Sequence, residues 1–152
     1  MPNGSTAFLI DANILVYAYD LASPEKRVWA LEVLAALAKT ERAAVSTQTL
    51  GEFFSAGTRK LRACLPAARA RGALEDFARA FHVFSVTPQI VLEAAIAAGQ
   101  HQMSFWDAQV WATAKLNQVP VVLSEDLQGW GFLEGVQFLN PLAESFDLSL
   151  LG

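Results

Sequence analysis

The sequence predicts a three-layer α/β/α sandwich with a central five-stranded parallel sheet. Two observations lead to this fold class: short apolar runs alternate with longer segments of helical periodicity, and several of the runs end on a polar residue. Strands that alternate with helices form parallel sheets, with helices on both faces and right-handed crossovers. The predicted strands are residues 7–10, 43–46, 82–86, 119–123 and 136–139.

The predicted helices begin at recognisable N-terminal signals. Asn13 is a suitable N-cap for the first helix, Ser23 followed by Pro24 for the second, and Ser104 for the last. Apolar residues near helical spacing make the second helix amphipathic, at positions Val28, Leu31, Leu34 and Leu37. The predicted helices are residues 13–19, 25–39, 47–65, 67–81, 89–98 and 105–117, and residues 99–103 are predicted to form a loop.

Length and composition predict one domain spanning residues 1–152. With 53% hydrophobic and 17% charged residues, the chain has ample core material, which argues against disorder. The single cysteine, Cys64, excludes an internal disulfide and a cysteine metal cluster, and so favours a reducing compartment. We find neither an apolar run of membrane-span length nor a signal peptide, so we expect a cytoplasmic protein without membrane contact.

The formal net charge of −4 does not attract nucleic acid, so binding to RNA would need a local basic patch. One short region holds five of the eleven basic residues. Three interpretations stay open: a solvated helical face, a phosphate-steering patch, and a surface for an acidic or amphipathic partner. The five residues are Arg59, Lys60, Arg62, Arg69 and Arg71.

Four acidic residues lie where a predicted strand ends or a predicted helix begins. Asp11 follows the first strand, Glu52 lies in the first turns after the second, and Asp126 follows the fourth. The carboxyl ends of parallel strands share one edge of a sheet, so these three should converge. Asp107 precedes the fourth strand, and it reaches the same edge only if the preceding loop crosses over.

Each acid also has a purely structural interpretation. Asp11 is explained by helix capping, Glu52 and Asp107 by capping boxes after Thr49 and Ser104, and Asp126 by a turn. The set favours a metal site, because clustered carboxylates repel one another and a cation removes that conflict. Oxygen ligands without a cysteine or a histidine pair select Mg²⁺ or Mn²⁺, and His82 and His101 are not assigned to the metal.

The order and the neighbours of these acids resemble the PIN-domain ribonucleases, in particular the VapC-type toxins of bacterial toxin–antitoxin pairs. The resemblance spans nearly the whole chain. It is carried by Leu9-Ile10-Asp11-Ala12-Asn13, Glu52, Ser104-Phe105-Trp106-Asp107-Ala108, Leu123-Ser124-Glu125-Asp126-Leu127-Gln128 and the closing Phe138-Leu139-Asn140-Pro141.

The resemblance implies a PIN-like fold, an Mg²⁺- or Mn²⁺-dependent endoribonuclease, a homodimer, and inhibition by a cognate antitoxin protein. By position, the acidic catalytic and metal-binding set would be Asp11, Glu52, Asp107 and Asp126, with Asp11 and Asp107 as the principal ligands. Asn13 and Ser124 would support the pocket by hydrogen bonding, and Glu125 is a weaker candidate. Chemically, Glu52 or Asp126 would orient or deprotonate the attacking water.

Other interpretations remain open for the site as a whole. One is a catalytically degenerate PIN-like module that only binds a partner. Another is a phospho-receiver-like Mg²⁺-binding module, but the third and fifth predicted strands end without the Asp and the Lys that such a module needs. A haloacid-dehalogenase-like phosphatase would need an acid where Asn13 stands.

Two aromatic features are predicted to belong to the core. The apolar stripe of the third helix reads as core, or as a groove for a partner helix if it is exposed. Trp106, beside Asp107, could stack on a base, but core packing is the favoured interpretation. The stripe consists of Leu50, Phe53, Phe54 and Leu61.

Overall fold

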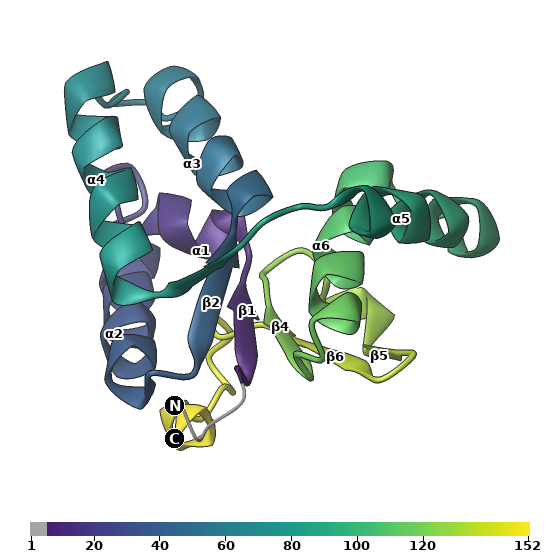
Figure 1. The fold of residues 1–152 in the computed structure, drawn as a ribbon. Helices are drawn as coiled ribbons and strands as arrows, with labels where there is room; N and C mark the ends of the chain where they lie inside the picture. The colour runs from purple at the N-terminus through teal and green to yellow at the C-terminus, as the bar shows by residue number, and fades with distance from the viewer. Residues whose placement is uncertain (1–5) are drawn as a thin grey trace.

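The computed structural model describes residues 6–152 and has the three-layer α/β/α arrangement that the sequence predicts (Figure 1). The strand order in the sheet is β3-β2-β1-β4-β6-β5. All neighbouring strands are parallel except β5 and β6, so the sheet is mixed. The strands are β1 (Phe8–Ile10), β2 (Ala43–Ser46), β3 (His82–Phe84), β4 (Val121–Leu123), β5 (Phe132–Leu133) and β6 (Val136–Leu139).

The prediction of five parallel strands was wrong in one respect, because β5 is a sixth strand and pairs antiparallel with β6. Leu133 pairs with Val136, and Glu134 and Gly135 form the two-residue turn between them. Both turn residues have positive φ, 45° and 87°, as this kind of hairpin turn requires. A two-residue edge strand carries too little periodicity to be predicted from the sequence.

The helices are arranged on the two faces of the sheet. Helices α1 to α4 cover one face, and α5 and α6 cover the other (Figure 1). Alternate residues of β1 pack on opposite faces of the sheet. Phe8 and Ile10 pack with α1 to α4, and Leu9 packs with α5 and α6. The helices are α1 (Ala12–Tyr17), α2 (Pro24–Thr40), α3 (Thr47–Arg59), α4 (Ala67–Ala80), α5 (Pro88–His101) and α6 (Phe105–Leu116), with 3₁₀ turns at Gln128–Trp130 and Leu148–Leu151.

Several predicted boundaries shift. Helix α3 ends at Arg59 rather than at residue 65, and α5 continues to His101 instead of ending before a loop at 99–103. Gly99 does not break α5; Gln102 closes it in the left-handed conformation, at φ 55°. The stripe predicted for α2 was half wrong, because Val28 and Leu31 are 52% and 43% exposed, and Ala30, Val33, Leu34 and Leu37 form the buried face.

The sheet has a topological switch point between β1 and β4. From β1 the chain winds outward through β2 to β3, and it then returns to place β4 on the other side of β1. At such a point the connections leave the sheet in opposite directions, and a crevice opens beyond the carboxyl ends of the two strands. Asp11 and Ser124 directly follow these two strands.

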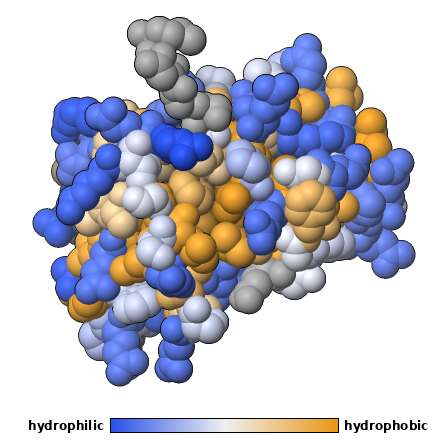
Figure 2. All heavy atoms as spheres, turned by 90° about the horizontal axis from the view of Figure 1, so that it is seen from below, coloured by the Kyte–Doolittle hydropathy of each residue, from blue (hydrophilic) through white to orange (hydrophobic). Residues whose placement is uncertain are grey.

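The start of β1 and the C-terminus lie at the opposite end of the sheet from this crevice (Figure 1). Seen from that end, an apolar area occupies the centre of the surface and hydrophilic side chains surround it (Figure 2). Across residues 6–152, the helices are too short or too polar to cross a membrane.

Candidate active site

Asp11 is held at the switch point by both of its neighbouring strands. Its backbone N–H donates to the carbonyl of Leu123 at 2.9 Å, which fixes the end of β1 against β4. Its side chain is 9% exposed, and Oδ1 accepts from the N–H of Ala12 at 2.8 Å. Asp11, and not Asn13 as predicted, is therefore the N-cap of α1.

Ser124 is the centre of a hydrogen-bond network that joins the ends of β1 and β4. Its fully buried hydroxyl donates to Oδ2 of Asp11 at 2.8 Å and accepts from Nδ2 of Asn13 and from the N–H of Asp126, both at 3.2 Å. Asn13 also donates to Oδ2 of Asp126 at 3.2 Å. Asn13 and Ser124 thus link two of the predicted acids through hydrogen bonds.

Glu52 lies on α3, which begins directly at the end of β2. The capping box here is formed by Ser46 and Thr49, whose side chains and backbone N–H groups bond reciprocally. The predicted box with Glu52 at the third helical position was therefore wrong, and Glu52 is not used for capping. Its Oε1 accepts from Nε2 of Gln48 at 3.3 Å instead.

Asp107 reaches the same edge of the sheet from the other layer. Ser104 caps α6 as predicted, with its hydroxyl accepting from the N–H of Asp107 at 3.2 Å. The start of α6 is tied to α3, because Nε2 of Gln48 donates to the carbonyl of Trp106 at 3.0 Å. The negative charge of Asp107 raises the pKa of both Asp11 and Glu52, so all three lie within electrostatic reach of one another.

The electrostatics of the site oppose the charged forms of two acids. Burial is the main cause that raises the pKa of Asp11, with a further increase from the charges of Asp107 and Asp126; the bonds from Ser124 and Ala12 oppose it. Glu52 is exposed as a whole residue, but partial desolvation of its carboxyl group, followed by the charge of Asp11, raises its pKa to about 7. The site gathers negative charge, which a proton or a cation would neutralise.

A cavity of about 480 Å³ opens beside these acids, between α1, α3 and the loop after β4. Asn13, Glu52 and Asp126 line it, and Lys60 contributes a basic group at its wall. Lys60 is the member of the predicted basic cluster that faces this cavity. Of the others, Arg69 stands 6.0 Å over the ring of Tyr19, and Arg71 forms an exposed ion pair with Glu75; these two contacts favour the solvated-face interpretation for that part of the cluster.

Glu125 is engaged elsewhere. Its Oε1 accepts from the hydroxyl of Tyr17 at 2.7 Å, and its Oε2 pairs with Nζ of Lys26 at 2.7 Å. The carboxylate already has a cation, in contrast to Asp11 and Glu52. This arrangement gives Glu125 a structural role at the rim of the cavity.

The donor set suits the predicted Mg²⁺ or Mn²⁺. Among residues 6–152, no three Asp, Glu, His or Cys side chains stand in an arrangement ready to hold a metal ion. Mg²⁺ does not need such a cage, since it keeps several waters and is bound by one or two carboxylates together with substrate phosphate. His82 packs against Phe84, and His101 lies near Glu134, so the available ligands at the site are oxygen atoms.

Three residues of the site were missed from the sequence, and one was misjudged. Gln48, Gln109 and Tyr17 are polar side chains on helices with no motif to mark them. Their roles emerge only from contacts between α3 and α6 and between α1 and the loop after β4. Trp106 was predicted to pack in the core, but it is 61% exposed. Of the predicted α3 stripe, Phe53 is fully buried and Leu50 packs against the core, as the core interpretation requires. Phe54 and Leu61 are only half-buried, and Leu61 lies beyond the end of α3.

The family model of the PIN domain matches residues 8–128 of the sequence. The match covers well over half of the chain, and the protein belongs to the PIN-domain family. No curated protein has a significantly similar sequence.

Solved structures with the same fold include toxins and toxin–antitoxin complexes. The sarcin–ricin-loop-cleaving toxin VapC20 of Mycobacterium tuberculosis superposes with a TM-score of 0.67 at 19% identity, covering 84% of this chain and 98% of the toxin. A toxin–antitoxin complex of Klebsiella pneumoniae has a TM-score of 0.60 at 23% identity over 89% and 98% of the two chains. VapBC2 of Rickettsia felis, bound to a promoter DNA fragment, has a TM-score of 0.63 at 15% identity over 88% and 98%.

Proposed function

We propose that the protein is a metal-dependent endoribonuclease that hydrolyses RNA phosphodiester bonds. The observation that carries this proposal is the electrostatic coupling of Asp11 with Glu52, Asp107 and Asp126 at the switch point of a PIN-domain sheet. These carboxylates come from four separate segments of the chain. Helix capping accounts for the contacts of Asp11 with Ala12, but it does not explain why the other three acids gather around it.

Asp11 and Asp107 would hold the Mg²⁺ or Mn²⁺ ion, with Glu52 and Asp126 completing the acidic set. When bound, the ion neutralises charge that develops on the phosphate and favours ionisation of water. Ser124 fixes one oxygen of Asp11 through the 2.8 Å hydrogen bond, so that the carboxylate is oriented before the ion arrives.

Glu52 is the best candidate for accepting the proton of the attacking water. In the metal-free protein, desolvation and the charge of Asp11 raise the pKa of Glu52 to about 7, so its carboxylate accepts a proton more readily than an ordinary glutamate. The water oxygen would attack phosphorus as its proton passes to Glu52, and the bond from phosphorus to the leaving ribose oxygen would break as that oxygen takes a proton from solvent. Glu52 would then return its proton to solvent. Asp126 is less suited, since Asn13 binds it and also binds Ser124, the residue that orients Asp11, so Asp126 belongs to the network that holds the proposed metal ligand in place.

The biological role we propose is that of a cytoplasmic toxin held inactive by a cognate antitoxin. The fold similarity to VapC20 and to toxin–antitoxin complexes supports this role. We also propose a homodimer. Val91, Leu92 and Ile96 of α5 are 39%, 65% and 55% exposed, which is the kind of apolar surface that association covers.

The activity is tested by incubating purified protein with RNA in Mg²⁺, in Mn²⁺ and in a chelator. We expect cleavage with either ion, no cleavage in the chelator, and none by the Asp11→Asn variant. Asp76→Asn is the matched control, since Asp76 is an exposed acid on α4 paired with Arg79. Equal cleavage by Asp11→Asn and wild type would refute the proposal.

The competing function is a degenerate PIN module that binds its partner without catalysis. The absence of a preformed cage of three acidic, His or Cys ligands among residues 6–152 is the observation in its favour. Calorimetric titration with Mn²⁺ separates the two, because an active enzyme binds the ion and loses that binding in Asp11→Asn. Co-expression with the product of the neighbouring reading frame and measurement of the solution mass test the antitoxin and the homodimer.

A further inference from the structure

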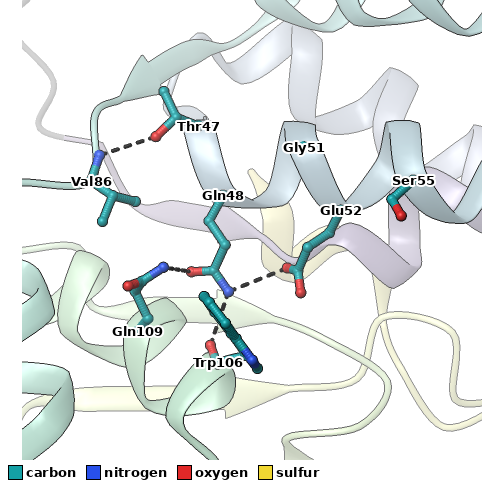
Figure 3. A pocket seen from close by; sticks show the side chains of 8 residues that line it. All are labelled: Thr47, Gln48, Gly51, Glu52, Ser55, Val86, Trp106 and Gln109. Atoms are coloured by element: carbon teal, nitrogen blue, oxygen red, sulfur yellow. Dashed lines mark hydrogen bonds between the residues drawn. The ribbon is translucent and has the colours of Figure 1, made fainter.

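A second cavity, of about 470 Å³, lies between the first turns of α3 and the start of α6 (Figure 3). Glu52 and Ser55 line this cavity as well as the one beside the acids, so the two are neighbouring parts of one depression. The mechanism uses only Glu52 of the residues that line it. The cavity is therefore positioned to hold a part of the substrate next to the phosphodiester that reacts.

Trp106 gives the cavity an aromatic wall. Its side chain is 61% exposed although it stands in the first turn of a helix whose following residues are almost all buried. Phe105 packs edge-on against it, with ring centroids 5.0 Å apart and planes at 84°. An exposed indole held by a neighbouring ring is suited to stacking on a planar base, an interaction that tolerates any of the bases.

Gln48 is fully engaged and holds the polar side of the cavity rigid. Its Nε2 donates to the carbonyl of Trp106 at 3.0 Å and to Oε1 of Glu52 at 3.3 Å, and its Oε1 accepts from Nε2 of Gln109 at 2.9 Å (Figure 3). These bonds fix the amide of Gln109, which is only 5% exposed. Its carbonyl oxygen is turned away from Gln48 and, within residues 6–152, receives no hydrogen bond (Figure 3).

The groups that remain free to bind a ligand are mainly acceptors. They are the carbonyl oxygen of Gln109 and the second carboxyl oxygen of Glu52, with the Ser55 hydroxyl able to act either way. This oxygen of Glu52 has two lone pairs, so it can accept from a base on one side and face the attacking water on the other. A base with several hydrogen-bond donors on one edge matches this set best. Guanine carries two neighbouring donor groups on its Watson–Crick edge, N1–H and the exocyclic amino group, whereas uracil carries one.

We propose that this cavity binds an unpaired guanine base adjacent to the phosphodiester that is cleaved, with the base stacked on Trp106 and its donor edge toward Gln109 and Glu52. This inference rests on the proposed function, because it assigns the cavity to the same RNA substrate. Recognition of unpaired bases by aromatic stacking and by hydrogen bonds to the Watson–Crick edge is how proteins read single-stranded RNA.

The test uses 5′-mononucleotides, which contain no internucleotide bond and cannot be cleaved. The four tryptophans give four indole N–H signals in a nitrogen-15 correlation spectrum, and the signal lost in Trp106→Phe identifies Trp106. We expect guanosine monophosphate in Mg²⁺ to shift this signal, and to bind more tightly than the adenosine, cytidine and uridine monophosphates. Inosine monophosphate, which lacks the exocyclic amino group, should bind more weakly than guanosine monophosphate.

Variants test the stacking with ligand-observed binding measurements. Trp106→Ala should lower the affinity for guanosine monophosphate about tenfold or more, and Trp106→Phe should retain most of that affinity. Phe132→Ala is the matched control, since Phe132 is a similarly exposed aromatic side chain on β5 (69%). Thermal unfolding of Trp106→Ala should match wild type because the indole is exposed.

The outcomes separate this inference from the proposed function. Equal binding of all four mononucleotides, or an unmoved Trp106 signal, would overturn the guanine site. RNA cleavage without any effect of guanosine monophosphate on Trp106 would overturn this inference alone. Binding of guanosine monophosphate at Trp106 by a protein that cleaves no RNA would support the base site and overturn the nuclease.

Discussion

The hydroxyl of Ser124 donates a hydrogen bond of 2.8 Å to Oδ2 of Asp11, joining residues 113 positions apart in the sequence. The contact forms because β1 and β4 are neighbours in the sheet, so the residues that follow them meet at the switch point. Both side chains are buried, and the serine is fully inaccessible. A buried carboxylate is costly unless it is hydrogen-bonded or paired, and Ser124 supplies one of the bonds that Asp11 accepts.

Replacing Ser124 with Ala should therefore weaken metal binding and cleavage more than it weakens the fold. The loss of a group that orients a metal ligand reduces affinity or activity by about 10- to 100-fold. The stability cost should be about 1–3 kcal/mol, because a buried acceptor loses its donor. Calorimetric Mn²⁺ titration and urea unfolding measure the two effects. Ser85→Ala, at an exposed serine, is the control, and an unchanged Mn²⁺ affinity in Ser124→Ala would contradict the orienting role.

Asp11→Asn should leave the metal-free protein as stable as wild type or more so. The amide keeps an oxygen for capping α1, while it removes a carboxyl whose pKa is raised by burial and by two neighbouring acids. At about 100 times its dissociation constant, Mg²⁺ should stabilise wild type by about 2.7 kcal/mol and the variant not at all. Thermal unfolding in chelator and in Mg²⁺ measures this difference. A marked loss of stability in chelator would instead show that the carboxylate is structural.

The sequence was sufficient to predict the layers of the fold and the edge at which the acids meet. Apolar runs locate the parallel strands, and every such run ends at the same edge, which is why Asp11 and Asp126 could be predicted to approach each other. The edge hairpin of β5 could not be predicted by periodicity, because β5 consists of only two residues, Phe132 and Leu133. The Glu134-Gly135 turn was the one local signal for it.

The base-binding side of the site could not be predicted, because it depends on contacts between distant helices. Gln48 and Gln109 are separated by 61 residues, and neither is part of a pattern that periodicity or spacing detects. Trp106 was placed in the core because aromatic residues usually pack there. Its exposure follows from its place at the very start of α6, on the side that faces the cavity and not the sheet.

The metal-free protein should lose stability as the pH rises, and Glu52 should account for part of this loss. The pKa of Glu52 is about 7 in the fold against an ordinary value of 4.5, so the folded protein binds the proton more tightly than the unfolded chain. The stabilisation is complete below pH 4.5 and disappears as the pH rises to about 7. Unfolding in chelator across this range should show that Glu52→Gln gains stability relative to wild type as the pH rises. A difference independent of pH would contradict the raised pKa.

The two acids that follow β4, Glu125 and Asp126, should respond differently when each is replaced by the corresponding amide. Asp126→Asn should reduce cleavage strongly, since Asp126 adds negative charge beside Asp11 and belongs to the proposed acidic set. Glu125→Gln should retain most of the activity, because its carboxylate is bound by Tyr17 and Lys26 at the rim. The stability cost of Glu125→Gln should be about 1 kcal/mol or less, since the side chain of Lys26 is 47% exposed and the ion pair is screened by water.

Single-turnover cleavage of one RNA substrate by both variants measures this contrast, with circular dichroism to compare their folds. A third variant, Lys26→Met, removes the cation and leaves the Glu125 carboxylate bound only by Tyr17. If Glu125 is structural, Lys26→Met and Glu125→Gln should have similar activity, both close to wild type. If Glu125→Gln instead loses as much activity as Asp126→Asn while its fold is intact, Glu125 belongs to the catalytic set and its ion pair with Lys26 must open during the reaction.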